Sequence, residues 1–294
     1  MLILFYLILF MISVVIPTHN RCQVLRICLE NLSCQAGVDF EVIVVGDGCT
    51  DDSEGATLTS RLQNVQFINQ PKSHQGTVRN RGVEMATGDI ILFIGDDILV
   101  EPGFLKKHLE THQAHPEENV VVLGYTTWDP TLKINDYMRF LESSGWQFGY
   151  SFLCPDFVER HDLYKFFYTS NISLKRSFFE REKFDEQFTV YGWEDVELGY
   201  RLFKNHGMKL FYEPKAKAYH HHLLTEADLP KKMQAIGKSA VYFQQLHPKT
   251  SVLPRGLKKG ILKIATLSFV VPLGRLFGKV FYYKLRSWQE FFRQ

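Results

Sequence analysis

The sequence predicts an α/β protein with a doubly wound, mostly parallel sheet flanked by helices, followed by a basic helical extension at its C-terminal end. Short apolar runs alternate with helical stretches roughly every 20 residues in the first third of the chain, a pattern typical of parallel sheets. The runs are continuously apolar, as in strands that are buried on both faces. A change of charge near Arg255 sets the C-terminal end apart.

The expected elements follow one another in a regular order. Residues 12–16 form a β-branched run that Pro17 ends, which predicts the first strand. A helix is expected over 23–32 and a second strand over 40–45. The Gly- and Asp-rich segment 46–53 predicts a loop. The later elements expected are strands at 65–68, 90–94 and 208–212, and helices at 79–85 and 228–246.

Three polar residues follow the ends of these strands. Thr18, Asp47 and Asp96 each come just past a predicted strand. Ligands of doubly wound sheets bind at the carboxyl ends of the strands, so we expect these side chains to share one cleft.

We expect an apolar extension over 1–11, a main domain over 12–225 and a helical extension over 226–294. Residues 1–11 lack the basic segment and cleavage site of a signal peptide, and the apolar run is shorter than the roughly 20 residues of a spanning helix. We interpret the first ten residues as an upstream extension of the kind that a misassigned start codon adds, and a short interfacial anchor is the alternative. From Arg255 onward nine Lys or Arg accompany one acidic residue, which indicates an anionic partner for the tail.

The most informative segment is 188–202, in which a Gly-Trp turn precedes Glu194 and Asp195. Apolar residues recur after this pair at helical spacing, so both carboxylates fall in a first helical turn, where the dipole favours their ionised forms. An aromatic ring beside an ionised carboxylate suits a sugar, which stacks on the ring while a hydroxyl gives up its proton. The alternative is that the two acids only complement the helix dipole.

Four further segments precede this motif, at 13–21, 41–53, 76–82 and 89–98. Together with the Gly-Trp-Glu-Asp element that ends at Asp195, and with the downstream His220, they resemble in order the motifs of family 2 glycosyltransferases with the GT-A fold. The resemblance covers roughly residues 12–222. The Gly-Trp-Glu-Asp element is most similar to the branch that contains chondroitin-type polymerases and β-1,4-galactosyltransferases.

The resemblance implies roles for the residues of the cleft. The nucleotide-binding residues would be Pro17, Thr18, Asp47, Arg79 and Asp96, with Thr18 and Asp47 at a uracil base and Asp96 at the ribose. Asp97 would bind Mn²⁺ or Mg²⁺, which prefer oxygen ligands, and His220 would be a further metal ligand. His222 is the fallback for His220, because alternate residues of an extended chain share a face.

The implied reaction is an inverting, metal-dependent transfer of a sugar from a nucleotide-sugar, with UDP-sugar favoured by Asp47, to a saccharide or lipid-linked saccharide. Asp195 is expected to be the general base, and Glu194 to share the catalytic site and, with Trp193, to bind the acceptor. Such an enzyme would serve cell-surface polysaccharide or glycolipid synthesis and would have no nucleic-acid partner.

Two other functions compete with this one. A sugar-phosphate nucleotidyltransferase needs a glycine-rich loop after the first strand, and the segment from Pro17 to Arg21 contains no glycine. The lack of a Gly-x-Gly-x-x-Gly segment after a strand excludes a dinucleotide dehydrogenase. A relative that binds nucleotide-sugar without turnover is the second alternative, because Gly95 stands where the family has the first Asp of its Asp-x-Asp metal motif.

Residues 256–288 are expected to form two short basic helices, rich in aromatic residues, at a membrane interface. Lys263, Arg275 and Lys279 interrupt any spanning segment, and Pro272 would break it. We therefore expect a cytoplasmic protein held on the inner face of the cell membrane. The alternative is a tail that packs against the main domain, with its lysines solvated.

Overall fold

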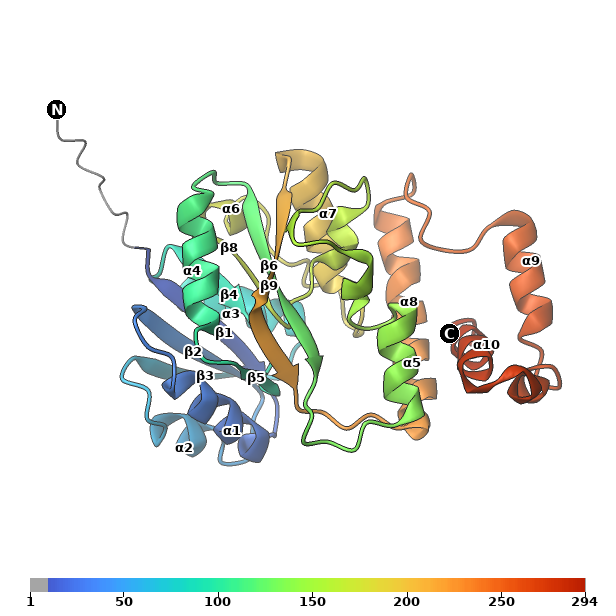
Figure 1. Ribbon diagram of the computed structural model, residues 1–294, viewed down its shortest axis with the longest axis horizontal. Coiled ribbons are helices and arrows are strands. Elements are labelled where there is room, and N and C mark those ends of the chain that lie inside the picture. Colours follow the sequence, from blue (N-terminus) through green and yellow to red (C-terminus); the bar gives the residue numbers. More distant parts are fainter. Residues whose placement is uncertain (1–9, 294) are drawn as a thin grey trace.

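The computed structural model describes residues 10–293, so the expected extension over 1–11 lies outside the described residues except for its last two. A nine-stranded sheet runs through the molecule, and the C-terminal helices lie together beyond α8 (Leu229–Leu246) (Figure 1). Alternate residues of the central strand enter different hydrophobic clusters, with Val15 in one and Val14 in the other. Both faces of the sheet are therefore covered, as the continuously apolar runs predicted.

The first half of the sheet is parallel and has the strand order β3-β2-β1-β4. Its strands are β1 (Ile12–Thr18), β2 (Phe40–Asp47), β3 (Val65–Gln70) and β4 (Ile90–Phe93). Its helices are α1 (Cys22–Ser33), α2 (Ser53–Leu58) and α3 (Gln75–Met85). The four predicted strands are thus confirmed. Three of them, β1, β2 and β3, end later than predicted, so that Thr18 and Asp47 are the last residues of β1 and β2.

The second half of the sheet is mixed. It adds β8 (Ile172–Lys175), β6 (Val120–Trp128), β9 (Lys209–His220), β5 (Ile98–Val100) and the short β7 (Asp156–Phe157). The strands β5, β7 and β8 run against the others, so six of the nine strands share one direction. The predicted doubly wound, mostly parallel sheet is confirmed.

Strand β9 is longer than the predicted strand over 208–212. Its register against β6 jumps from Glu213, opposite Gly124, to Lys217, opposite Tyr125. Pro214 lies in this bulge, where it need not donate a hydrogen bond to the sheet, so it does not end the strand. The consequence for the site is that β9 continues to His220.

The remaining elements include a helix that the sequence pattern did not predict, α5 (Asp136–Ser144), which the Asn135 side chain caps by accepting from the Met138 N–H at 3.0 Å. The other elements are α4 (Phe104–Ala114), η1 (Gly149–Phe152), η2 (Leu163–Phe166), α6 (Arg176–Phe179), α7 (Glu194–His206), η3 (Glu226–Asp228), α9 (Gly256–Ala265), η4 (Val271–Phe277) and α10 (Lys279–Phe291).

The C-terminal helices divide into a packed part and an exposed part. Helix α10 packs against α8 and α5, and the buried Glu290 carboxylate holds Arg286, Arg293 and Gln234 at 2.8–2.9 Å. Helix α9 has no buried residue and stands at the far end of the molecule (Figure 1). No helix within residues 10–293 is both long and apolar enough to cross a membrane.

Gly237 permits the close approach of α8 to α10. A Cβ atom at Gly237 would lie 2.4 Å from the backbone oxygen of Phe291, whereas a Cβ at Gly260 in α9 would meet no atom within 4 Å. We expect Gly237→Ala to lower the free energy of unfolding by about 1–3 kcal/mol through overpacking. Gly260→Ala is the matched control and should be neutral or raise stability by up to about 1 kcal/mol. Urea unfolding of both variants would test this, and equal stability of Gly237→Ala and wild type would contradict it.

Candidate functional site

A cavity of about 860 Å³ opens at the carboxyl ends of β1, β2 and β4. Every residue that the sequence predicted for the site lines it: Pro17, Thr18, Asp47, Arg79, Asp96, Asp97, Trp193, Glu194, Asp195 and His220. The cavity also receives residues from α8 and α10, which the sequence did not assign to it.

One oxygen of Asp97 is the meeting point of three side chains. Its Oδ2 atom lies 2.9 Å from Arg21 Nη2, 3.3 Å from His220 Nε2 and 3.3 Å from His222 Nδ1. The ligand atoms of Asp97, His220 and His222 all lie within 4.8 Å of one another. Carboxylate oxygen and imidazole nitrogen are ligands that Mn²⁺ accepts, so this group fits a divalent cation.

The three consecutive histidines divide between two sides of the chain. His220 ends β9, pairs with Ile98 of β5, and stacks on Trp128 with ring centres 5.4 Å apart. His221 turns away, with Nδ1 2.6 Å from an Asp129 carboxylate oxygen. His222 therefore returns to the side of His220, as the alternation of an extended chain predicted. The structure places the fallback ligand beside Asp97 as closely as the first choice.

Arg21 offsets the charge of the two adjacent carboxylates. Its Nη1 atom lies 2.8 Å from Asp96 Oδ1, and the Thr18 hydroxyl donates to the other Asp96 oxygen at 2.7 Å. Burial and the charge of Asp97 raise the pKa of Asp96. Burial opposes ionisation of Asp97 as well, but His220, His222 and Arg21 outweigh it and hold the pKa of Asp97 well below its ordinary value. Sequence analysis did not predict this role for Arg21, because Arg21 lies 75 residues from Asp96 along the chain.

Asp47 lies at another part of the cavity wall. It accepts from the Ser73 N–H at 2.6 Å and pairs with Lys72 at 3.0 Å. Burial would raise the pKa of Asp47, but the Ser73 and Lys72 contacts outweigh it and lower the pKa. Asp47 is therefore an ionised acceptor for an N–H donor in the cavity.

The Gly-Trp turn aims the first turn of α7 into the cavity. Gly192 has φ +139°, which disfavours any other residue, and its N–H donates to Glu194 at 3.0 Å. Glu194 is buried, whereas Asp195 is half-buried and lines the cavity. Burial and the charge of Glu194 raise the pKa of Asp195. Because a higher pKa makes a carboxylate a stronger proton acceptor, the environment suits Asp195 to general-base chemistry.

Arg79 lines the cavity, but its guanidinium pairs with Glu194 at 3.3 Å, and both side chains are buried. Gln75 accepts a second hydrogen bond from it at 3.2 Å. In this structure Arg79 therefore neutralises Glu194, and its predicted contact with a nucleotide stays a prediction.

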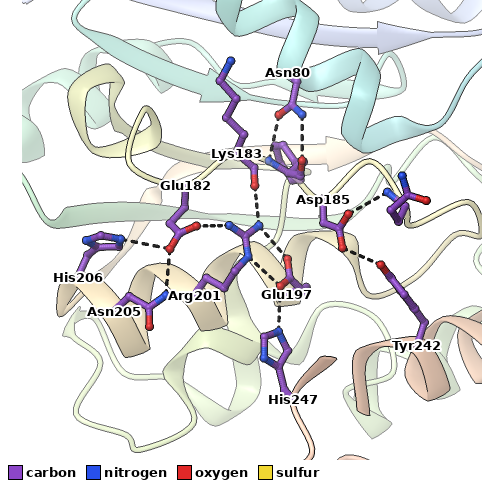
Figure 2. Close-up of polar contacts among 12 residues, drawn as sticks. Asn80, Glu182, Lys183, Asp185, Glu197, Arg201, Asn205, His206, Tyr242 and His247 are labelled. Carbon is purple, nitrogen blue, oxygen red and sulfur yellow. Dashed lines mark hydrogen bonds and ion pairs between the residues drawn. The ribbon is translucent and has the colours of Figure 1, made fainter. Parts of the chain in front are cut away.

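A polar network holds α7 in place (Figure 2). Glu197 is buried at the end of the first turn of α7. Its carboxylate accepts a hydrogen bond from Arg201 Nε at 2.8 Å and lies 2.9 Å from His247 Nε2. Arg201 also pairs with Glu182, and Tyr242 of α8 donates to Asp185 at 3.0 Å (Figure 2). The network thus fastens the helix that carries Asp195 to the loop before it and to the end of α8.

Aromatic side chains from distant parts of the chain form another wall of the cavity. Trp193 from the Gly-Trp turn and Trp146 after α5 both line it, with Trp288 and Phe291 of α10. The rings of Trp146 and Trp288 lie 5.5 Å apart, edge to face. Such surfaces suit the apolar faces of sugars. Sequence reasoning found Trp193 from its motif. Trp146 lies in the stretch 136–179, whose dense aromatic residues predicted an acceptor-side region, whereas Trp288 was assigned to the tail and not to the cavity.

Comparison with known proteins identifies the family to which this chain is similar. The model of the family described as "Glycosyl transferase family 2" matches residues 13–188, more than half of the chain. The chain is similar to a validoxylamine A glucosyltransferase from Streptomyces hygroscopicus (29% identity, 68% of the chain and 53% of the relative). It is also similar to a chondroitin synthase from Escherichia coli (27% identity, 71% of the chain and 34% of the relative). The chain thus spans about half or less of these relatives. The predicted resemblance to family 2 glycosyltransferases, with a chondroitin synthase among the similar proteins, is confirmed.

Solved structures share the fold at lower identity. One is a mannosyltransferase from Pyrobaculum calidifontis that was solved with GDP-Man and Mn²⁺. The superposition has a TM-score of 0.61 at 15% sequence identity, and it covers 95% of this chain and 84% of the mannosyltransferase. The S. aureus protein TarS, residues 1–349 with UDP-GlcNAc, gives a TM-score of 0.54 at 17% identity, with 95% and 89% covered. These likenesses confirm the predicted GT-A fold.

The positions of the three histidines allow a test of the cation-binding group, with His221 as the control. We expect Asp97→Asn, His220→Ala and His222→Ala each to weaken Mn²⁺ binding by more than about tenfold, since loss of even an outer partner of a metal ligand costs that much. His221→Ala removes the neighbouring imidazole that faces Asp129 and should leave the affinity unchanged. Calorimetric titration with Mn²⁺ would measure this. A loss in His221→Ala equal to that in His220→Ala would refute the assignment.

Proposed function

Because this chain belongs to glycosyl transferase family 2, we propose that it is an inverting, metal-dependent enzyme that transfers a hexose-type sugar from a nucleotide-sugar to a saccharide or lipid-linked saccharide. The observation that carries the proposal is the meeting, in one cavity, of a proton-accepting carboxylate at Asp195 with the cation-binding group at Asp97. An aromatic wall that suits a sugar lies in the same cavity.

The residues of α7 carry out the acceptor chemistry in this proposal. The acceptor hydroxyl gives its proton to Asp195, and its oxygen bonds to the anomeric carbon as the bond from that carbon to the diphosphate breaks on the opposite face. This single displacement inverts the anomeric centre. Glu194, fixed by Arg79 and the Gly192 N–H, and the Trp193 ring orient the acceptor.

Pro17, Thr18, Asp47 and Asp96 would hold the nucleoside of the donor. Asp47, kept ionised by its neighbours, can accept from the imide N–H of uracil, which favours UDP. Asp97, His220 and His222 would hold Mn²⁺ or Mg²⁺, which when bound neutralises diphosphate charge. Structural neighbours solved with UDP-GlcNAc and with GDP-Man and Mn²⁺ support a nucleotide-sugar donor and a divalent cation.

We also propose that the exposed part of the C-terminal extension binds an anionic membrane surface on the cytoplasmic face. Among the described residues, ten of the sixteen exposed large apolar side chains lie between Leu257 and Phe281. Leu257, Ile261 and Ile264 share one face of α9 at a spacing of four and three residues, with lysines between them. Such a surface would bring a lipid-linked acceptor to the enzyme, as expected in polysaccharide or glycolipid synthesis.

Asp195→Asn should retain UDP binding but reduce transfer by about 10²–10⁴-fold, the usual cost of a lost general base. In the wild type, transfer should fall as pH is lowered through an apparent pKa above the ordinary carboxylate value of about 4, since only ionised Asp195 accepts the proton. Single-turnover rates across pH 4–9, with an acceptor found by screening glycosides, would measure both. Near wild-type transfer by Asp195→Asn would remove Asp195 from this role.

The membrane proposal is tested by changing the exposed face of α9. Combined Leu257→Gln, Ile261→Gln and Ile264→Gln should reduce sedimentation with anionic phospholipid vesicles, and added salt should release the wild type. Leu58→Gln, an equally exposed apolar site on α2, should not change sedimentation. Cutting the chain near Pro254 is a poorer test, because it would also remove α10 from the cavity wall. Equal sedimentation of the triple variant and the wild type with the vesicles would contradict the membrane proposal.

A further inference from the structure

The cations of the cavity are almost all paired. In the described part of the chain, five Lys or Arg residues line it, and four have a carboxylate partner within 4.0 Å: Arg21, Lys72, Arg79 and Lys165. The fifth is Lys232, in the first turn of α8. No carboxylate of residues 10–293 lies within 4.0 Å of its ammonium nitrogen.

Lys232 instead has neutral neighbours beside the cation-binding group. Its ammonium donates to the Gln147 side-chain oxygen, and the Gln147 amide nitrogen lies 3.4 Å from His220 Nδ1. The Lys232 nitrogen also lies 5.8 Å from the centre of the Tyr191 ring. Asp228, one helical turn earlier, accepts from Thr225 at 2.7 and 2.9 Å and forms no ion pair with Lys232.

The charged form of Lys232 is energetically unfavourable at this position when no anion is bound nearby. Burial lowers the pKa of Lys232 to about 8, although Asp228 and Asp97 limit the fall. The amine is therefore still largely protonated at neutral pH. A partly desolvated charge without a counter-ion lowers stability, and binding sites retain such charges where an ion of opposite sign completes them.

We propose that Lys232 binds the diphosphate of the nucleotide donor and stabilises the charge on that group as it leaves. The inference rests on the proposed function, which supplies an anion in the same cavity. It makes α8, which lies beyond residues 13–188 of the family match, a part of the donor site. Preplaced cations of this kind stabilise charge that develops in the transition state.

The test compares diphosphate-bearing and diphosphate-free probes. In calorimetric titrations with Mn²⁺, Lys232→Gln should weaken binding of UDP or GDP by about tenfold or more, the usual cost of a lost charge-assisted hydrogen bond. Binding of uridine or guanosine should change less than twofold. Lys231→Gln changes the exposed neighbouring lysine on the same helix and should leave both affinities unchanged. Lys232→Arg should restore most of the nucleotide affinity.

A second readout separates ligand binding from a structural role. Lys232→Met removes the unpaired charge, so its thermal unfolding temperature without nucleotide should equal or exceed that of wild type, while UDP and GDP stabilise it less. Unchanged nucleotide affinity in Lys232→Gln, or equal losses for nucleotide and nucleoside, would overturn the inference and leave the proposed function standing. Failure of the wild type to bind either nucleotide would instead refute the proposed function, and this inference with it.

Discussion

The site depends on the placement of two adjacent carboxylates, Asp96 and Asp97, in a cavity where their charges repel. Side chains that offset this repulsion must be brought to them, and these side chains come from the ends of two different strands. Arg21 follows β1, and His220 ends β9 with His222 just beyond. The order of strands in the sheet is thus what assembles the group. Because three side chains meet at one Asp97 oxygen, a change at any of these strand ends alters the charge balance of the whole group.

The opposite side of the cavity also holds two adjacent carboxylates, Glu194 and Asp195, with an arginine beside them. Arg79 pairs with the buried Glu194. Burial and the charge of Glu194 raise the pKa of Asp195, and the charge of Arg79 limits the rise. The network around Glu197 and Arg201 then fixes the helix that presents Asp195 (Figure 2). Two acidic pairs thus acquire different properties from their surroundings. One is suited to cations, and the other to accepting a proton.

Local patterns in the sequence predicted the parallel half of the sheet, because continuous apolar runs record its strands. Short motifs and the family resemblance that they carry predicted ten of the residues that line the cavity. Local patterns predicted a strand over 208–212 and extended chain at His220, but not that both belong to one strand, because only pairing with β6 reveals the bulge around Pro214. Arg21, Trp288 and Lys232 were missed for a related reason. Each acquires its role from residues distant in the chain, and packing of α8 and α10 on the main domain places the last two. In the C-terminal tail, α10 packs against the rest of the protein, as the alternative hypothesis stated. Binding of the exposed α9 to a membrane interface stays a prediction.

The most direct test of this account is the position of a bound cation. Crystals grown with Mn²⁺ and UDP would be measured at a wavelength where manganese scatters anomalously. The account predicts one strong peak between Asp97, His220 and His222, with the Arg21 guanidinium moved from the Asp97 oxygen that it contacts here. A manganese peak elsewhere in the cavity, or nucleotide bound with Arg21 still paired to Asp97 and no peak beside it, would contradict the central claim.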